Sequence, residues 1–560
     1  MKEFALLIVF LNILDYVISQ EISPHLYSIN AWMPDTLGNT EDCFGKNNGI
    51  PCHLNGKIYK GNIWGQVKQS GARLIRLGGE AADENKPTMQ QYIKLIDTVR
   101  AYGMEPILQV PYNNNYYTSD TAAAIVEYVN IKMGRNVKYW SIGNEPDLNP
   151  PYGYGYISAS PIADYIKQFA KKMKAVDSTI FTLGPELKFC NNNHNLINDL
   201  TDPGGFYDIT GIIPGHTYFY IDIITFHYYP FDGNQLYDQI VKNLREPYQL
   251  SQSLDSLNSR VKKCNEFHKR GINPIKAAIT ETNVNYKNSL DSSKAEVNAH
   301  SFFAGQFWAD ILRIAMEKKL EFVCFWSIVE KSLGYIDDST YVPRPTYHHF
   351  KLMSDYLKGK YSTSTFDIKV DDLKVITSYN EEQIAVMVLN QKKLGKGYQY
   401  TLHIGDGKIV SSNGINIRIN EASLVKGNVV YSDYIEDEST VLIVFSRYGD
   451  IIKKYEYNKK DIRPRIIKNP NIPLLVNLEI IDAIKMNQVV TLSAGTLNNK
   501  ASYFWYEDNE KRPINRKSSV TLKVLANRNK KIRLITTYED FKLEELVNLV
   551  IEEKIEESID

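Results

Sequence analysis

The feature that most constrains the fold is a regular alternation of short apolar segments and longer helical segments between residues 25 and 358. Alternating strands and helices predict a parallel sheet. Eight repeats of this unit favour a closed (β/α)8 barrel over an open sheet. The expected strands are, in chain order, residues 25–32, 72–79, 104–111, 137–144, 179–186, 221–229, 276–282 and 322–328.

The helical segments show apolar residues at helical spacing. The clearest are residues 90–101, 122–132, 161–176 and 304–318. A doubly wound nucleotide-binding fold would place a glycine-rich phosphate loop after an early strand. Residues 77–79 (LGG) are followed by Glu80 without a further glycine at the required spacing, which argues against that fold.

The pattern changes after about residue 360, where helical spacing disappears and short strands alternate with Gly and Asn turns. This predicts an antiparallel β-sandwich over residues 359–458, packed on the barrel (residues 20–358). Residues 459–473 are basic and contain three prolines, which is typical of a linker. Residues 474–560 are predicted to form an immunoglobulin-like β domain with Trp505 as a buried aromatic and an acidic tail. The strands expected in these two domains are residues 375–379, 383–389, 399–404, 415–419, 440–445, 489–493, 501–506, 519–524 and 532–537.

Charge and targeting signals narrow the function. Lys plus Arg and Asp plus Glu both total 65, so no net charge draws the protein toward nucleic acid or an anionic membrane. A neutral substrate follows as the default. Residues 1–19 have a Lys2 start and an apolar run too short to span a bilayer, as in a signal peptide. We therefore expect a secreted or cell-surface protein with no membrane span.

The chain has five cysteines, an odd number that excludes complete intramolecular pairing. Cys43 and Cys52 lie in one Gly- and Pro-containing loop and are the best candidate pair in an oxidising compartment. Cys324 lies in an apolar strand and is expected to be a core thiol. The cysteines and histidines form no metal-binding motif, so we predict neither a metal nor a cofactor.

Functional residues of a (β/α)8 barrel lie at the C-terminal ends of its strands. Two glutamates, Glu145 after the fourth strand and Glu281 at the seventh, are what glycosidic cleavage needs. One would be a protonated acid, and the other an ionised nucleophile or a base that positions water. The further polar or aromatic side chains at strand ends are Arg76, Asn144, His227, Tyr229 and Trp326.

These segments resemble the clan A glycoside hydrolases. Residues 140–147 (WSIGNEPD) and 279–283 (ITETN) match the clan's acid/base and nucleophile positions. Residues 76–79 (RLGG) resemble the strand-two motif of arabinofuranosidases, heparanase-like enzymes and certain endoglucanases. Residues 227–229 (HYY) and Trp326 resemble the clan's strand-six and strand-eight motifs. The resemblance covers residues 25–358 and extends to the following sandwich, but not to residues 474–552.

The resemblance implies a retaining mechanism with Glu145 as general acid/base and Glu281 as nucleophile. Arg76 would keep Glu281 ionised and aimed, because a nearby cation favours a charged carboxylate.

Four further candidates for substrate binding or positioning follow from the resemblance. Asn144 would hydrogen-bond the sugar 2-hydroxyl. His227 and Tyr229 are two residues apart on a strand and share a face, so they would orient the carboxylates. Trp326 would support the sugar ring. His227 as a core histidine and Trp326 as a core aromatic are the structural alternatives.

The substrate predicted is an oligo- or polysaccharide, and we expect a monomer that binds no nucleic acid. Tyrosine-rich residues 112–117 and 150–156 would suit extended glycan subsites, or they reflect compositional drift. Two alternative functions remain: a catalytically inactive carbohydrate-binding barrel, and a transglycosylase that uses the same residues. Intact Glu145 and Glu281 argue against the first, because a binder has no need for the pair.

Overall fold

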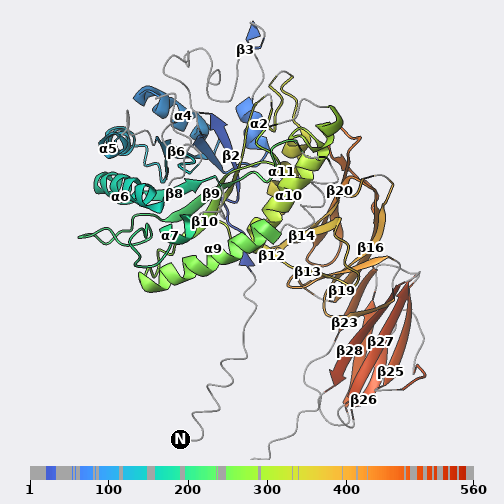
Figure 1. The fold of residues 1–560 in the computed structure, drawn as a ribbon. Helices are drawn as coiled ribbons and strands as arrows, with labels where there is room; N and C mark the ends of the chain where they lie inside the picture. Colours follow the sequence, from blue (N-terminus) through green and yellow to red (C-terminus); the bar gives the residue numbers. More distant parts are fainter. Residues whose placement is uncertain are drawn as a thin grey trace, which may run out of the picture. The chain divides into compact units, whose positions relative to one another are not determined.

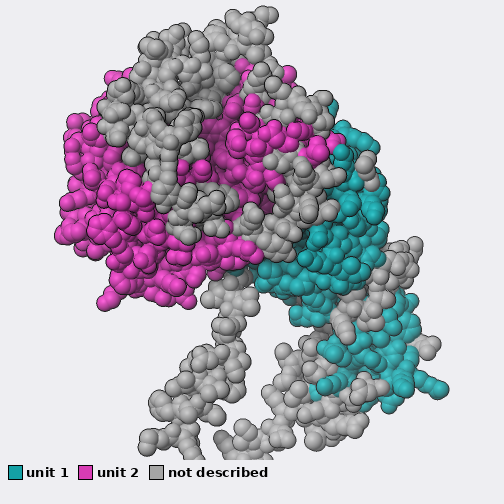
Figure 2. Space-filling model, viewed as in Figure 1, with its two compact units in different colours: residues 1–20, 356–560 teal, residues 21–355 magenta. Residues whose placement is uncertain are grey.

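The computed structural model divides into two compact units, residues 21–355 and residues 1–20 with 356–560 (Figure 2). The structure describes residues 20–32, 53–54, 57–58, 63–79, 82, 87–111, 118–147, 158–188, 196–234, 236, 248–287, 292–330, 332–338, 340–393, 395–411, 414–425, 427–471, 474–479, 488–495, 501–507, 510–513, 521–526, 530–538 and 541–549.

Residues 21–355 form the predicted closed barrel of eight parallel strands (Figure 1). Each strand pairs with the next one around the barrel, and β11 closes it against β2. Every expected strand is present in the expected order, which confirms the (β/α)8 prediction. The strands are β2 (Tyr27–Trp32), β5 (Leu74–Gly78), β6 (Glu105–Val110), β7 (Tyr139–Ile142), β8 (Phe181–Leu187), β9 (Ile223–Tyr228), β10 (Lys276–Thr282) and β11 (Val323–Phe325).

The helices of this unit begin and end close to the expected positions. A capping box starts α4 (Met89–Ala101). The Thr88 hydroxyl accepts from the backbone N–H of Gln91, and the Gln91 side-chain oxygen accepts from the backbone N–H of Thr88. The segment expected at residues 122–132 is α5 (Ser119–Val126), continued by the π-helix Glu127–Lys132. The other helices are α2 (Ile63–Gln69), α6 (Ala159–Val176), α7 (Leu196–Leu200), α9 (Tyr248–Phe267), the 3-10 helix Ser292–Val297, α10 (Phe302–Glu317) and α11 (Pro345–Tyr356).

Apolar side chains fill the barrel and the layer between strands and helices. Inside the barrel, a cluster that includes Leu74, Leu183 and Cys324 is buried. Cys324 is a free core thiol, as predicted. Outside the strands, the Trp308 ring on α10 stacks on Phe325 with ring centres 4.1 Å apart.

Residues 356–560 contain antiparallel sheets, as expected for β-sandwich domains. All expected strands are present, although the sequence pattern missed several others. The strands of this part are β12 (Lys360–Ser362), β13 (Ser364–Phe366), β14 (Leu373–Tyr379), β15 (Gln383–Asn390), β16 (Tyr398–Ile404), β17 (Lys408–Ser411), β18 (Ile415–Ile419), β19 (Asn428–Ile435), β20 (Ser439–Ser446), β21 (Ile451–Asn458), β22 (Arg465–Ile466), β23 (Leu474–Glu479), β24 (Gln488–Gly495), β25 (Ser502–Glu507), β26 (Thr521–Ala526), β27 (Lys530–Tyr538) and β28 (Phe541–Leu549). The remaining short strands of the chain are β1 (Gln20–Glu21), β3 (His53–Leu54) and β4 (Lys57–Ile58).

Strand pairing crosses the boundary that the sequence predicts between the second and third domains. β23 pairs with β19, and β28 pairs with β17. The predicted linker contains the short strand β22, which pairs with β21. Trp505 is fully buried in this part of the chain. The domain limits at residues 458 and 474 remain predictions.

Several sequence predictions lie outside the described residues. They are the signal peptide (residues 1–19), the Cys43–Cys52 pair and the tyrosine-rich segments 112–117 and 150–156. Within the described part of the chain, none of the helices combines the length and apolar character that a membrane crossing requires.

We predict that Trp308→Ala destabilises the barrel by about 3–5 kcal/mol, because it opens a cavity beneath fully buried Trp308. It also removes the hydrogen bond from the Trp308 ring to Asn283 Oδ1. The measurement is urea unfolding of the full chain followed by tryptophan fluorescence. The matched control is Ile131→Ala, whose side chain is exposed and which should change the free energy of unfolding by less than about 0.5 kcal/mol. Equal effects of both variants would contradict the packing described here.

Candidate active site

Polar side chains gather at the C-terminal ends of five barrel strands. Arg76 lies on β5, and Glu145 follows β7. Glu186 lies near the end of β8, His227 near the end of β9, and Glu281 near the end of β10. This is the end of the barrel where parallel strands present functional groups.

Arg76 is the centre of this cluster. Its side chain is fully buried, and a buried charge requires partners. The guanidinium meets this requirement with short hydrogen bonds to side-chain oxygens from five strands or strand ends. They are Asn30 Oδ1 (3.0 Å), Glu281 Oε1 (2.8 Å), Gln109 Oε1 (3.0 Å), Asn144 Oδ1 (3.0 Å) and Glu186 Oε2 (3.2 Å).

Glu186 is a fully buried anion that the sequence analysis did not nominate. Besides Arg76, its carboxylate accepts hydrogen bonds from three hydroxyl groups. They belong to Ser141 (2.8 Å), Thr225 (2.9 Å) and Thr280 (2.7 Å). Burial alone would raise the pKa of Glu186, but the charge of Arg76 and the hydrogen bond and charge of His227 outweigh it and lower the pKa to about 2. Glu186 is therefore an ionised anchor rather than a proton donor.

His227 bridges two of the carboxylates. Its Nδ1 lies 2.8 Å from Glu145 Oε1, and its Nε2 lies 3.2 Å from Glu186 Oε2. Burial alone would lower the pKa of the His227 imidazole. The charges and hydrogen bonds of Glu281, Glu145 and Glu186 have the larger effect and raise this pKa to about 10. A ring protonated on both nitrogens can donate to both neighbours at once.

Glu281 is held from two sides. Arg76 donates to its Oε1, and the Tyr229 hydroxyl donates to its Oε2 over 3.0 Å. His227 Nδ1 lies 3.6 Å from the same Oε2. Carboxylate oxygens of Glu145 and Glu281 and a ring nitrogen of His227 all lie within 4.8 Å of one another. The two glutamates therefore face a shared space.

The backbone at two of the glutamates is in the left-handed region. Glu145 has φ 41° and Glu186 has φ 56°. Such angles cost free energy for a residue with a side chain and persist where the surroundings hold them. Here the Glu145 amide donates to the Glu186 carbonyl oxygen over 2.9 Å, which ties the two strand ends together.

The glycines of the RLGG segment are required by close approach. A Cβ on Gly78 would lie 2.4 Å from Gln109 Oε1. A Cβ on Gly79, which has φ 83°, would lie 2.5 Å from the Trp326 ring and 3.5 Å from Glu281 Oε1. The indole of Trp326 therefore reaches the site beside Glu281. Its ring nitrogen donates to Glu330 Oε2 over 2.8 Å, which fixes the orientation of the ring.

The structure thus brings together all the site residues predicted from sequence, namely Arg76, Asn144, Glu145, His227, Tyr229, Glu281 and Trp326. Arg76 and His227 are fully buried, and both hydrogen-bond carboxylates of the cluster. Sequence reasoning missed Asn30, Gln109 and Glu186. Glu186 did have a signal, since it ends the fifth predicted strand.

An imidazole and two carboxylates at these separations also form a possible ligand set for a divalent cation. Two features oppose that use. The raised pKa of His227 keeps its ring protonated, and a protonated ring has no lone pair for a metal. Arg76 also places a positive charge 2.8 Å from Glu281.

No protein-family model matches the chain, and no curated protein matches its sequence. Solved structures do match. A family 51 α-L-arabinofuranosidase from Bifidobacterium longum matches with TM-score 0.52 at 12% identity, over 76% of this chain and 96% of that one. An α-L-arabinofuranosidase from Thermotoga maritima matches with TM-score 0.51 at 18% identity, over 77% and 98%. A bifunctional glucanase-xylanase from a metagenome library matches with TM-score 0.50 at 14% identity, over 76% and 96%.

These matches confirm, at the level of the fold, the resemblance to the clan A glycosidases. The chain has the barrel of these enzymes together with following β-structure.

The paired charges make stability depend on pH in a definite direction. The pKa of His227 is raised from 6.5 to about 10. Its contribution to the free energy of unfolding is therefore complete below pH 6.5 and is lost as the pH rises through 10. The pKa of Glu186 is lowered from 4.5 to about 2, so its contribution to the free energy of unfolding is present above pH 4.5 and is lost as the pH falls through 2.

We predict that the His227 ring stays protonated at pH 8, where an ordinary imidazole is neutral. The measurement is NMR of the protein labelled with 15N-histidine, with His227→Gln used to assign the signal. Glu186→Gln should lower the pKa of His227 because it removes one neighbouring charge. A His227 ring that titrates near 6.5 in the unsubstituted protein would contradict the charge arrangement described here.

Proposed function

We propose that this protein is a retaining glycoside hydrolase in which Glu145 is the general acid/base and Glu281 is the nucleophile. The observation that carries the proposal is the closeness of the two glutamates, since one carboxylate oxygen of Glu145 lies within 4.8 Å of one of Glu281. Retaining enzymes hold their carboxyl groups about 5–5.5 Å apart, whereas inverting enzymes need about 6.5–9.5 Å to admit a water molecule.

The charges of the cluster support this division of roles. Arg76 and His227 face the three carboxylates in different ways. Arg76 hydrogen-bonds Glu186 and Glu281, so its positive charge lies against both of these carboxylates. Glu145 contacts His227 instead, and its side chain is 18% exposed toward the space where a substrate would enter. Glu145 is therefore the carboxyl group placed to exchange a proton with the leaving group.

In the first step, a Glu281 oxygen would attack the anomeric carbon while Glu145 gives its proton to the departing glycosidic oxygen. The carbon–oxygen bond to the leaving group breaks, and an ester bond to Glu281 forms. Glu145 becomes an anion as Glu281 loses its charge, so the net charge of the cluster does not change in this step. Protonated His227, 2.8 Å from Glu145, stabilises the new anion.

In the second step, Glu145 would take a proton from water, and the hydroxide oxygen would attack the anomeric carbon. The ester bond breaks, Glu281 regains its negative charge, and Glu145 is again protonated. Two displacements at one carbon restore its original configuration. Arg76 and Tyr229 receive the returning charge on Glu281 through bonds that already exist.

Two further side chains are placed to hold the sugar. Asn144 uses Oδ1 to accept from Arg76, so its amide nitrogen would donate to a sugar hydroxyl. The indole of Trp326 lies beside Gly79 and Glu281, where it would support the apolar side of a sugar.

The substrate we propose is a neutral oligo- or polysaccharide. Its support is the zero net charge of the chain and the kind of substrate named for the structural neighbours. The first compounds to test are therefore aryl α-L-arabinofuranosides, β-xylosides and β-glucosides, followed by the corresponding polymers.

An inactive carbohydrate-binding protein is disfavoured, because it would not need two buried cations to hold the carboxylates in position. A transglycosylase would use the same residues and differ in its acceptor.

We predict that Glu281→Ala lowers kcat by at least about 10⁴-fold on whichever aryl glycoside the protein cleaves, because no covalent intermediate can form. Added azide should restore part of the turnover and give a glycosyl azide of inverted configuration, because the small anion fills the vacated space. The matched control is Glu127→Ala, which removes an exposed glutamate of the same barrel and should leave kcat unchanged. Full activity of Glu281→Ala would remove Glu281 from the mechanism.

A further inference from the structure

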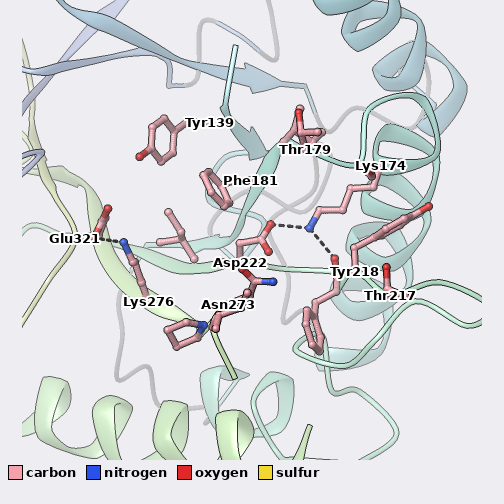
Figure 3. Close-up of a pocket in the computed structure, with 16 residues that line it drawn as sticks. Tyr139, Lys174, Thr179, Phe181, Thr217, Tyr218, Asp222, Asn273, Lys276 and Glu321 are labelled. Carbon is pink, nitrogen blue, oxygen red and sulfur yellow. Dashed lines mark hydrogen bonds and ion pairs between the residues drawn. The ribbon is translucent and has the colours of Figure 1, made fainter. Parts of the chain in front are cut away.

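A cavity of about 470 Å³ lies at the other end of the barrel, where its strands begin (Figure 3). This volume is within the roughly 300–1,000 Å³ that is common for small-ligand sites. We call it the lower pocket. The residues that carry the argument are Tyr139, Lys174, Phe181, Asp222, Lys276 and Glu321.

The lower pocket is separate from the candidate active site. Tyr139 begins β7, Phe181 begins β8 and Lys276 begins β10, whereas Glu145, Glu186 and Glu281 follow or end the same strands. A strand rises about 3.3 Å per residue. The lower pocket and the catalytic cluster therefore lie at opposite ends of the same barrel strands, with the buried barrel core between them.

The charges of the lower pocket are balanced in pairs. Lys174 Nζ lies 2.6 Å from Asp222 Oδ2, and Lys276 Nζ lies 2.8 Å from Glu321 Oε2. Figure 3 shows the Lys276–Glu321 pair on one side of the space and Lys174 on the other. Two lysines and two carboxylates leave no net charge, so a neutral ligand fits and a polyanion gains nothing from this lining.

One wall of the lower pocket is aromatic. The rings of Tyr139 and Phe181 lie 5.7 Å apart. Phe181 is 43% exposed, which is unusual for a large apolar side chain at the start of a barrel strand. An exposed ring face of this kind is a platform for the C–H face of a sugar ring.

Other polar groups that line the cavity are available to a ligand. They are the side chains of Ser178, Thr217, Tyr218 and Asn273, none of which hydrogen-bonds another residue in the part of the chain that the structure describes. Hydroxyl and amide groups of this kind can donate to or accept from the hydroxyls of a sugar. Together with the ring of Phe181, they offer one apolar face and several convergent polar contacts.

We propose that the lower pocket binds one or two rings of a neutral saccharide chain. The ligand class follows from the lining of the cavity, namely balanced charges, an exposed aromatic face, and hydroxyl and amide groups. It does not rest on the catalytic assignment. A polymer held at this site would raise the local concentration of its own segments around the protein. The site therefore contributes to binding of polymers and not to turnover of short substrates.

The test uses the full chain with Phe181→Ala and Asn273→Ala combined, in a Glu281→Ala background that prevents cleavage. Native gels containing arabinan, xylan, xyloglucan or mixed-linkage β-glucan report the affinity through retarded migration. We expect at least one of these neutral polymers to retard the background protein, with a Kd that the double substitution weakens about fivefold or more. Polygalacturonate, a polyanion, should retard neither protein.

Phe206→Ala is the matched control, since it removes an exposed aromatic ring of the same unit outside the cavity and should leave retardation unchanged. The double substitution in the protein with intact Glu281 should leave kcat/KM on an aryl glycoside unchanged, which also shows that it folds. The proposal is overturned if no neutral polymer retards the background protein, or if the double substitution has no effect. It is also overturned if Phe206→Ala has the same effect. Failure of the catalytic proposal is distinct, because it would appear as absent aryl-glycoside turnover in the unsubstituted protein.

Discussion

The arrangement of the candidate active site depends on the buried guanidinium of Arg76. The guanidinium is fully buried and donates hydrogen bonds to side chains on β2 and β6 and at the ends of β7, β8 and β10. Leaving a buried charge without partners would cost several kcal/mol, so each strand end must stay where Arg76 can reach it. Glu186 provides the permanent counter-charge, because its pKa is lowered to about 2. The position of Glu281 is therefore set before any substrate arrives.

The same cluster gives the two neighbouring glutamates different surroundings, which suit the different roles proposed for them. Glu281 hydrogen-bonds Arg76 and Tyr229, whereas Glu145 hydrogen-bonds His227. In the proposed mechanism, negative charge moves from Glu281 to Glu145 and back while the net charge of the cluster stays the same. Fixed donors that already face both positions stabilise the developing charge without reorganisation. The left-handed backbone at Glu145, held by the carbonyl of Glu186, is part of this preorganisation.

The sequence predicted the barrel well because its strands are apolar and separated by clear helical periodicity. It predicted Arg76, Glu145 and Glu281 because strand ends and recognisable motifs marked them. It missed β19 and β21, where charged and polar residues interrupt the strand pattern. Glu186 was also missed, because one buried glutamate at a strand end looks like any other until its partners on other strands are known. Pairing of β23 with β19 is a long-range contact that no local pattern encodes.

The central claim is that Glu281 forms a covalent bond with the sugar while Glu145 handles the proton. The most direct measurement is mass spectrometry of the protein treated with the activated 2-deoxy-2-fluoro derivative of a glycoside that it cleaves. The fluorine slows breakdown of the intermediate, so the glycosyl-enzyme accumulates. Peptide mapping should place a single glycosyl group on Glu281, and reactivation should follow its loss. A glycosyl group on another residue, or an unlabelled enzyme that releases sugar of inverted configuration, would contradict the account.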